Sequence, residues 1–185
     1  GVNHVIGLKT NGSLWTWGQN LYGQVGDGTT SNRFSPYEVM PRSRWKGIAA
    51  GGFNSYGLRD DGSVWRWGLG YGGVGSAIDI TPMQIGAETN WVAISSGMYH
   101  LLAIKRDGSL WVHGPNSWFF VGGTGFTPGK GFVQVGTNLN WKEIHSGQNF
   151  SVLRKTDGSW WIAGDNSILN LARLPLTATG REPVP

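Results

Sequence analysis

The chain has 185 residues, of which 31 are Gly and 11 are Trp, and its 15 Lys and Arg exceed its 11 Asp and Glu to give a net charge of +4. Abundant Gly and aromatic residues are typical of short strands joined by tight turns, and they disfavour helices. The absence of Cys excludes disulfides and thiolate metal sites, and the absence of a long apolar run excludes a membrane-spanning helix.

The first predicted element is a β-hairpin over residues 1–18, with Asn11-Gly12 at its tip. Asn-Gly between two apolar runs is the strongest short-range signal for a two-residue type I′ turn. Such a turn pairs Leu8 with Trp15, and the period of two in a strand then gathers one apolar face. The side chains expected on that buried face are Ile6, Leu8, Trp15 and Trp17.

The hairpin motif returns three times, each time as Asp-Gly-Ser. Its glycines recur at intervals of 50, 46 and 50 residues, at positions Gly12, Gly62, Gly108 and Gly158. A Trp-x-x-Ile segment precedes each later turn, beginning at Trp45, Trp91 and Trp141. Landmarks in fixed order at one period indicate a repeat array, and we expect the turn glycines to have positive φ.

The repeats predict equivalent structural anchors. Besides the turn glycines, these are Trp15, Trp65, Trp111 and Trp161, together with His4 and His100, which share a repeat position. The type I′ register places the four tryptophans opposite Leu8, Leu58, Ile104 and Arg154, respectively. Trp161 is therefore expected to make a cation–π contact with Arg154. We expect the two His rings to be hydrogen-bonded beneath their hairpins in a structural role.

Taken in order, the approximate units are residues 1–44, 45–90, 91–140 and 141–185, forming a single array. The first unit lacks its Trp-x-x-Ile strand, and the fourth is degenerate because Phe150, Arg154 and Ala163 interrupt the pattern. Three or four short strands per unit of about 50 residues are typical of a propeller blade. We expect an all-β fold, a β-propeller of short antiparallel strands with about four blades in a partial ring.

The first unit carries a specific pattern, Gly1-x-x-His4-x-x-x-Leu8-x-x-Asn11-Gly12-Ser13-x-Trp15-x-Trp17-Gly18-x-Asn20-x-Tyr22-Gly23-Gln24-Val25-Gly26-Asp27-Gly28. It resembles the regulator of chromosome condensation repeat, and the resemblance extends over nearly the whole chain. The family implies seven-bladed propellers that bind proteins through loops, without a common chemistry. The Trp-rich Asp-Gly-Ser form resembles the bacterial branch, which indicates a protein outside the cell or in the cell envelope of a bacterium.

Catalytic signals are weak throughout the sequence. Asp61, Asp107 and Asp157 are explained as turn residues, and no nucleophile, base and orienting group form a local signature. The Gly-rich loops lack the Lys and the following helix of a phosphate-binding loop. We therefore expect no enzyme, no cofactor and no metal.

Two groups of residues are candidate partner-binding sites. The aromatic group consists of Trp118, Phe119, Phe120 and Phe126; it either fills a gap between blades or forms an exposed hot spot for a protein or glycan. The basic group consists of Arg33, Arg42, Arg44 and Lys46; it is either a solvated face or a site for an anionic partner. We expect nucleic acid to be a minor possibility, since the net charge is modest.

Three functions fit these features. The first is a non-enzymatic protein–protein interaction module that binds through the loops connecting blades. The alternatives are a carbohydrate-binding propeller with exposed aromatic loops and a regulator of a GTPase or of chromatin by family analogy. The incomplete repeats also predict either self-association of two half-rings or a fragment of a longer propeller.

Overall fold

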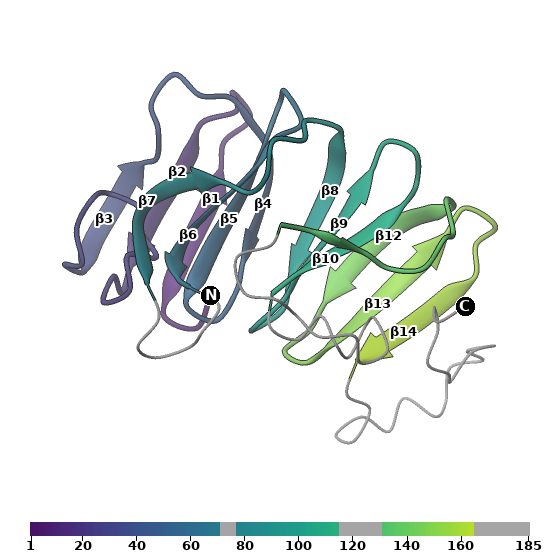
Figure 1. The fold of residues 1–185 in the computed structure, drawn as a ribbon. Coiled ribbons are helices and arrows are strands. Elements are labelled where there is room, and N and C mark those ends of the chain that lie inside the picture. The colour runs from purple at the N-terminus through teal and green to yellow at the C-terminus, as the bar shows by residue number, and fades with distance from the viewer. Residues whose placement is uncertain (71–76, 115–130, 165–185) are drawn as a thin grey trace.

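The computed structural model describes residues 1–70, 77–114 and 131–164, and all regular secondary structure in these ranges is β-strand. The strands form antiparallel sheets that follow one another along the chain, here called blades 1 to 4 (Figure 1). Blade 1 contains β1 (His4–Leu8), β2 (Leu14–Gly18) and β3 (Arg33–Glu38). Blade 2 contains β4 (Trp45–Ala50), β5 (Asn54–Arg59), β6 (Val64–Leu69) and β7 (Ile78–Gln84).

Blades 3 and 4 repeat this arrangement. Blade 3 contains β8 (Trp91–Ser96), β9 (Leu101–Lys105), β10 (Leu110–His113) and β11 (Val133–Gln134). Blade 4 contains β12 (Trp141–Ser146), β13 (Phe150–Lys155) and β14 (Trp160–Gly164). The Trp-x-x-Ile strands β4, β8 and β12 pack against one another and are the inner strands of their blades. The expected all-β fold of short antiparallel strands is confirmed.

The hairpin turns have three loop residues, so the predicted two-residue type I′ turn is wrong. The Lys9 carbonyl accepts a hydrogen bond from the Gly12 amide at 2.9 Å, and the Lys9 amide donates to the Ser13 carbonyl at 2.9 Å. This is the geometry of a type I turn followed by one residue in the left-handed region. The four turn glycines take that position, with φ between 82° and 88°, so their predicted positive φ is confirmed.

The extra loop residue shifts the ladder by one position. Trp15 pairs with Gly7 instead of Leu8, and Leu8 pairs with Leu14. Because successive side chains of a strand point to opposite faces, this slip places Leu8 and Trp15, which were predicted to share one apolar face, on opposite faces of the sheet. Each hairpin therefore has an aliphatic face and a tryptophan face. The residues found opposite Trp15, Trp65, Trp111 and Trp161 are Gly7, Gly57, Ala103 and Leu153.

The core lies between blades. The aliphatic face of blade 1, with Leu14 fully buried, packs on the tryptophan face of blade 2, where Trp45 and Trp67 are buried. Blade 2 packs on blade 3 in the same sense through Leu58 and Trp91, and an equivalent cluster joins blade 3 to blade 4. A repeat that buries its faces only against its neighbours gains stability from each interface it makes.

The turn glycines also connect the blades. The Gly12 carbonyl accepts a hydrogen bond from the Trp45 amide at 2.9 Å, and Gly62 and Gly108 accept in the same way from Trp91 and Trp141. Each turn is therefore fixed to the first residue of the next inner strand. Gly158 occupies the same turn position, and no described atom lies within 4 Å of a Cβ built there.

We expect Gly62→Ala to destabilise the protein clearly more than Gly158→Ala. Both substitutions force a side chain into the left-handed region, at a cost of about 1–3 kcal/mol. Only at Gly62 would the new Cβ also collide with the backbone carbonyl oxygen of Thr89 in the connection to blade 3. Urea unfolding of the two variants measures the difference, and equal losses of unfolding free energy would contradict the role of this turn in joining blades.

Candidate functional site

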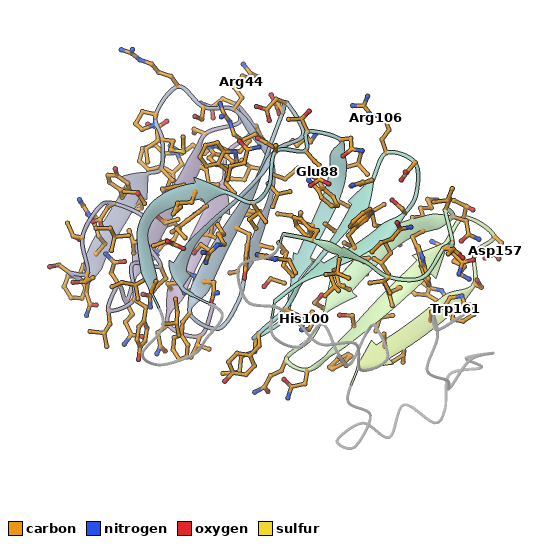
Figure 2. The ribbon with its side chains drawn as sticks, in the orientation of Figure 1. Arg44, Glu88, His100, Arg106, Asp157 and Trp161 are labelled. Atoms are coloured by element: carbon orange, nitrogen blue, oxygen red, sulfur yellow. The ribbon has the colours of Figure 1, made fainter. Side chains whose placement is uncertain are left out.

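The blades present two ends with different chemistry. The turn end carries the four hairpin turns and the connectors into the inner strands of blades 2 to 4, namely residues 39–44, 85–90 and 135–140. The loop end carries the longer segment 19–32 and the short segments 51–53, 97–100 and 147–149. Figure 2 shows Arg44 and Arg106 at the turn end and His100 at the loop end.

The Asp-Gly-Ser-x-Trp motif is a local hydrogen-bonded unit at the turn end. Asp61 Oδ1 accepts hydrogen bonds from the backbone amide of Ser63 at 2.9 Å and from its hydroxyl at 2.6 Å. The Ser63 hydroxyl oxygen accepts a hydrogen bond from Trp65 Nε1 at 2.8 Å. The same chain of bonds recurs in the other blades, with Asn11 replacing Asp in the first.

These hydrogen bonds explain the acidic turn residues. The Ser63 hydroxyl, followed by the Ser63 amide, lowers the pKa of Asp61, because both bonds stabilise the carboxylate. The Ser109 and Ser159 hydroxyls lower the pKa of Asp107 and Asp157 in the same way. The three carboxylates therefore bind their own turns, which agrees with the turn role predicted from the sequence.

A cation lies over each anchor tryptophan. Lys105 Nζ is 3.7 Å from the ring centre of Trp111 and 4.8 Å from that of Trp91. The equivalent pairs in the other blades are Lys9 with Trp15, Arg59 with Trp65 and Lys155 with Trp161. The predicted contact of Arg154 with Trp161 is wrong, because the shifted register turns Arg154 to the opposite face, where it lies over Trp160 and pairs with Glu143.

The sequence contained the signal for this cation. A Lys or Arg stands three residues before every turn glycine, at Lys9, Arg59, Lys105 and Lys155. Its side chain stacks on the indole beside the turn, and an attraction of this kind contributes about 0.5–2 kcal/mol, depending on desolvation. The recurrence indicates that these four cations are structural.

Two buried histidines join neighbouring blades. His4 Nε2 lies 3.0 Å from the Ser55 hydroxyl of blade 2, and His100 Nε2 lies 3.0 Å from the Ser151 hydroxyl of blade 4. Burial lowers the pKa of each imidazole to about 4, so both rings are neutral at pH 7. Their predicted structural role agrees with this geometry, although the bonds join different blades instead of lying within a hairpin.

The loop end is connected by backbone hydrogen bonds that pass from blade to blade. The Val2 amide donates to the Gly52 carbonyl at 3.2 Å, Gly52 donates to Met98 at 3.3 Å, and Met98 donates to Gln148 at 3.0 Å. Beside this series lies an open hollow of about 430 Å³, lined largely by glycine backbone and small side chains. The backbone amides and carbonyls of this series are already hydrogen-bonded between blades, so the hollow has few polar groups left to orient a ligand.

The structure separates the predicted basic group. Arg33 lies at the loop end, where its Nε is 2.6 Å from Asp27 Oδ2 and its guanidinium stacks on Tyr37. Asp27 in turn accepts bonds from Asn20 and Thr29, so Arg33 completes the packing of the segment 19–32. The remaining members of the group, Arg42, Arg44 and Lys46, lie together at the turn end.

The connector from blade 1 to blade 2 holds these three cations. Within the described ranges, the non-Gly residues with positive φ are Met40, at 47°, and Arg42, at 76°, and both lie in this connector. Arg44 Nε is 3.3 Å from Asp60 Oδ2, and Lys46 Nζ is 3.4 Å from the Asp60 carbonyl oxygen. The Arg44 side chain remains 72% exposed, so this pair is open to solvent.

The candidate aromatic residues Trp118, Phe119, Phe120 and Phe126 lie outside the described residues. An exposed aromatic residue that the sequence analysis missed is Phe34, which is 93% exposed on β3. It borders a hollow of about 390 Å³ that is also lined by Asp27 and Arg33. Alternation with the polar residues Arg33 and Ser35 would have predicted an inward Phe34, so the sequence held no signal for its exposure.

The described part of the chain shows neither of two further features. In residues 1–70, 77–114 and 131–164, no three His, Cys, Asp or Glu side chains come close enough to hold a metal ion. The same residues include no helix with the length and apolar character needed to span a membrane.

The fold defines the class of protein, a β-propeller-type repeat array. Among solved structures, the chain is similar to human WBSCR16, with a TM-score of 0.76 at 17% identity over 89% of this chain and 46% of that one. It is also similar to yeast RCC1 (Prp20) in complex with Kap60, with a TM-score of 0.75 at 20% identity over 89% of this chain and 42% of that one. The chain thus spans less than half the length of these proteins.

A family model also matches one part of the chain. The family model described as the regulator of chromosome condensation (RCC1) repeat matches residues 11–58, and the predicted resemblance to this repeat is confirmed. A further similar structure is Prp20p from Saccharomyces cerevisiae, with a TM-score of 0.75 at 22% identity over 90% of this chain and 43% of that one. The matched residues run from the turn of blade 1 through β5, so the sequence repeat spans the junction of two blades.

The buried histidines predict a loss of stability in acid. A group with a folded pKa of about 4 and an unfolded pKa near 6.5 binds more protons when unfolded, so stability is full above pH 6.5 and falls as pH drops towards 4. At pH 5 the loss is about 2 kcal/mol for each such imidazole. Urea unfolding of wild type, His100→Gln and His145→Gln from pH 7.5 to 4.5 measures the slope.

We expect a shallower pH slope in His100→Gln and an unchanged slope in His145→Gln, because His145 is exposed on β12. An unchanged slope in both variants would show that the buried imidazole is not responsible for the acid sensitivity.

Proposed function

We propose that the chain is a non-enzymatic protein–protein interaction module that binds its partner through the blade-connecting loops at the turn end. The observation that carries the proposal is the connector 39–44, where two non-Gly residues with positive φ coincide with exposed basic side chains. Each such residue costs about 1–3 kcal/mol, and conformations of this kind cluster at functional sites.

The chemistry of this connector favours an acidic protein surface. Arg42 and Lys46 are exposed, and Arg44 shares Asp60 with Lys46. Asp60 and the neighbouring Asp61 offset part of this positive charge, so three cations face two carboxylates here. A basic patch of this kind accelerates association with an anionic partner and makes it dependent on salt.

The similar structures support the same type of function. One of them is yeast RCC1 (Prp20) bound to Kap60, and another was solved together with an account of the binding of Prp20p to Gsp1p and histones. These likenesses are at low identity and concern longer chains, so for this chain a regulator of a GTPase or of chromatin is a second candidate. A basic connector suits an acidic partner better than it suits histones.

The use of ionisable residues favours binding over catalysis. The turn carboxylates accept hydrogen bonds from Ser side chains, and His4 and His100 join blades, so these groups are occupied in structural roles. A glycan-binding role and self-association of half-rings stay predictions from the sequence, as does a location outside the cell or in a bacterial envelope.

Neutralising the connector should remove binding without unfolding the protein. We expect the triple variant Arg42→Ser, Arg44→Ser and Lys46→Ser to capture at least about tenfold less partner protein from a lysate of the source cells at low salt. Quantitative mass spectrometry of the captured proteins, with wild type in parallel, provides the measurement.

The matched control is Lys142→Ser. Lys142 follows Trp141 at the start of the inner strand of blade 4, as Lys46 follows Trp45 in blade 2. This substitution should leave capture unchanged. Parallel assays with duplex DNA, purified histones and a glycan array distinguish the alternatives. Capture that is equal in the triple variant and wild type, or binding confined to glycans, would reject the proposed surface.

A further inference from the structure

The hairpin turn of blade 1 carries an amide where the later turns carry a carboxylate. Asn11 stands at the repeat position of Asp61, Asp107 and Asp157, and Asn11-Gly12 is the only Asn-Gly pair in the sequence. An Asn side chain is most readily attacked by the following backbone nitrogen when the next residue is Gly, which has no side chain to hinder the approach. The sequence therefore places a candidate deamidation site in this turn.

The side chain at this turn position is open to water. Asn11 is exposed, and so are Asp61 and Asp107, which lie in turns with a blade on either side. Exposure is thus a property of the turn position in every blade and does not depend on which segments flank blade 1. Water, the reactant of the second step of deamidation, reaches the Asn11 amide directly.

The reaction consists of two steps. The Gly12 nitrogen forms a bond to Cγ of Asn11, and the side-chain NH₂ group leaves with the proton of that nitrogen as ammonia. Water then opens the cyclic imide, adding OH to one carbonyl carbon and returning a proton to the nitrogen. Cleavage of the new Cγ–N bond gives Asp, and cleavage of the original peptide bond gives an isoaspartyl linkage.

The folded turn restrains the first step. The Gly12 amide donates a hydrogen bond to the Lys9 carbonyl at 2.9 Å, and the Gly12 carbonyl accepts one from the Trp45 amide at 2.9 Å. Asn11 Oδ1 accepts from the Ser13 amide at 3.1 Å and from the Ser13 hydroxyl at 2.8 Å. Attack on Cγ requires the Asn11–Gly12 peptide to rotate, so these bonds must first open locally.

The two products differ in how well they fit the turn. A carboxylate fits it, since Asp107 Oδ1 accepts from the Ser109 amide at 2.9 Å and from the Ser109 hydroxyl at 2.6 Å. An isoaspartyl residue instead adds its Cβ to the main chain and makes the loop one atom longer. The longer loop displaces the Gly12 carbonyl from the Trp45 amide, which weakens the connection between blades 1 and 2.

We propose that Asn11 is a deamidation site at which opening of the Gly12–Trp45 hydrogen bond between blades controls the reaction. Both products carry a new negative charge beside the connector 39–44, because a Cβ built on Gly12 lies 3.8 Å from the Arg44 Cα. Deamidation therefore lowers the positive charge of the turn end and weakens its attraction for an acidic partner. Only this effect on binding rests on the function proposed above.

The test follows the mass of the proteolytic fragment that contains Asn11 while the full chain is incubated at mildly alkaline pH. The fragment should gain the mass of an amide-to-acid conversion, at least about tenfold more slowly than a linear peptide of residues 8–15. Ser13→Ala should speed the conversion, because it removes the hydroxyl that holds Oδ1. The matched control Ser159→Ala removes the same hydroxyl from the turn of blade 4 and should leave the rate at Asn11 unchanged.

Two further variants test the consequences of the conversion. Asn11→Asp represents one product and should melt close to wild type, whereas the isoaspartyl form, separated by chromatography, should melt at a lower temperature. In the capture assay at low salt, Asn11→Asp should retain at most about half of the partner that wild type captures, and Asn11→Gln should retain all of it. The mass measurement needs no partner, so failure of the proposed function would leave it unaffected.

Three results would overturn the proposal or its consequence. Equal rates in the folded chain and the linear peptide would reject control by the turn. An unchanged Asn11 in the folded chain after about a hundred half-lives of the peptide reaction would reject the site itself. Equal capture by Asn11→Asp and wild type, while the triple variant of the connector loses capture, would reject the effect of the new charge on binding.

Discussion

The packing of one blade's aliphatic face on the next blade's tryptophan face is the interaction on which the rest of this structure depends. A single sheet of three or four short strands has two apolar faces and cannot bury both by itself. Leu14, Leu58 and Leu110 are each buried in such an interface. The turn glycines then fix the spacing, because their carbonyls accept a hydrogen bond from the first residue of the next inner strand.

This packing explains why so many polar groups have structural roles. Asp61 accepts a hydrogen bond from the Ser63 hydroxyl, and that hydroxyl accepts one from the Trp65 indole. His4 and His100 connect blades from buried positions. Buried polar groups need partners, and here the neighbouring blade supplies many of them. Groups available for recognition are consequently found in the connectors between blades.

The proposed connector surface lies where one unit departs from the repeat. The connector 39–44 differs from its counterparts by its cations, by the positive φ of Arg42, and by Met40, which takes a positive φ where the counterparts have Gly86 and Gly136, so it is a local departure from the pattern.

The amino-acid sequence alone determined the period, the turn glycines, the inner Trp-x-x-Ile strands and the all-β class, because each depends on residue type at a short, repeated spacing. Tertiary structure decided the register and the partners. Asn-Gly or Asp-Gly followed by Ser is compatible with a loop of two or three residues, and a change of one residue moves Leu8 and Trp15 to opposite faces. The stacked blades favour the three-residue loop, since it gives each side of the sheet a complementary neighbour. The contacts of His4 with Ser55 and of Lys105 with Trp91 likewise need packing that brings distant segments together.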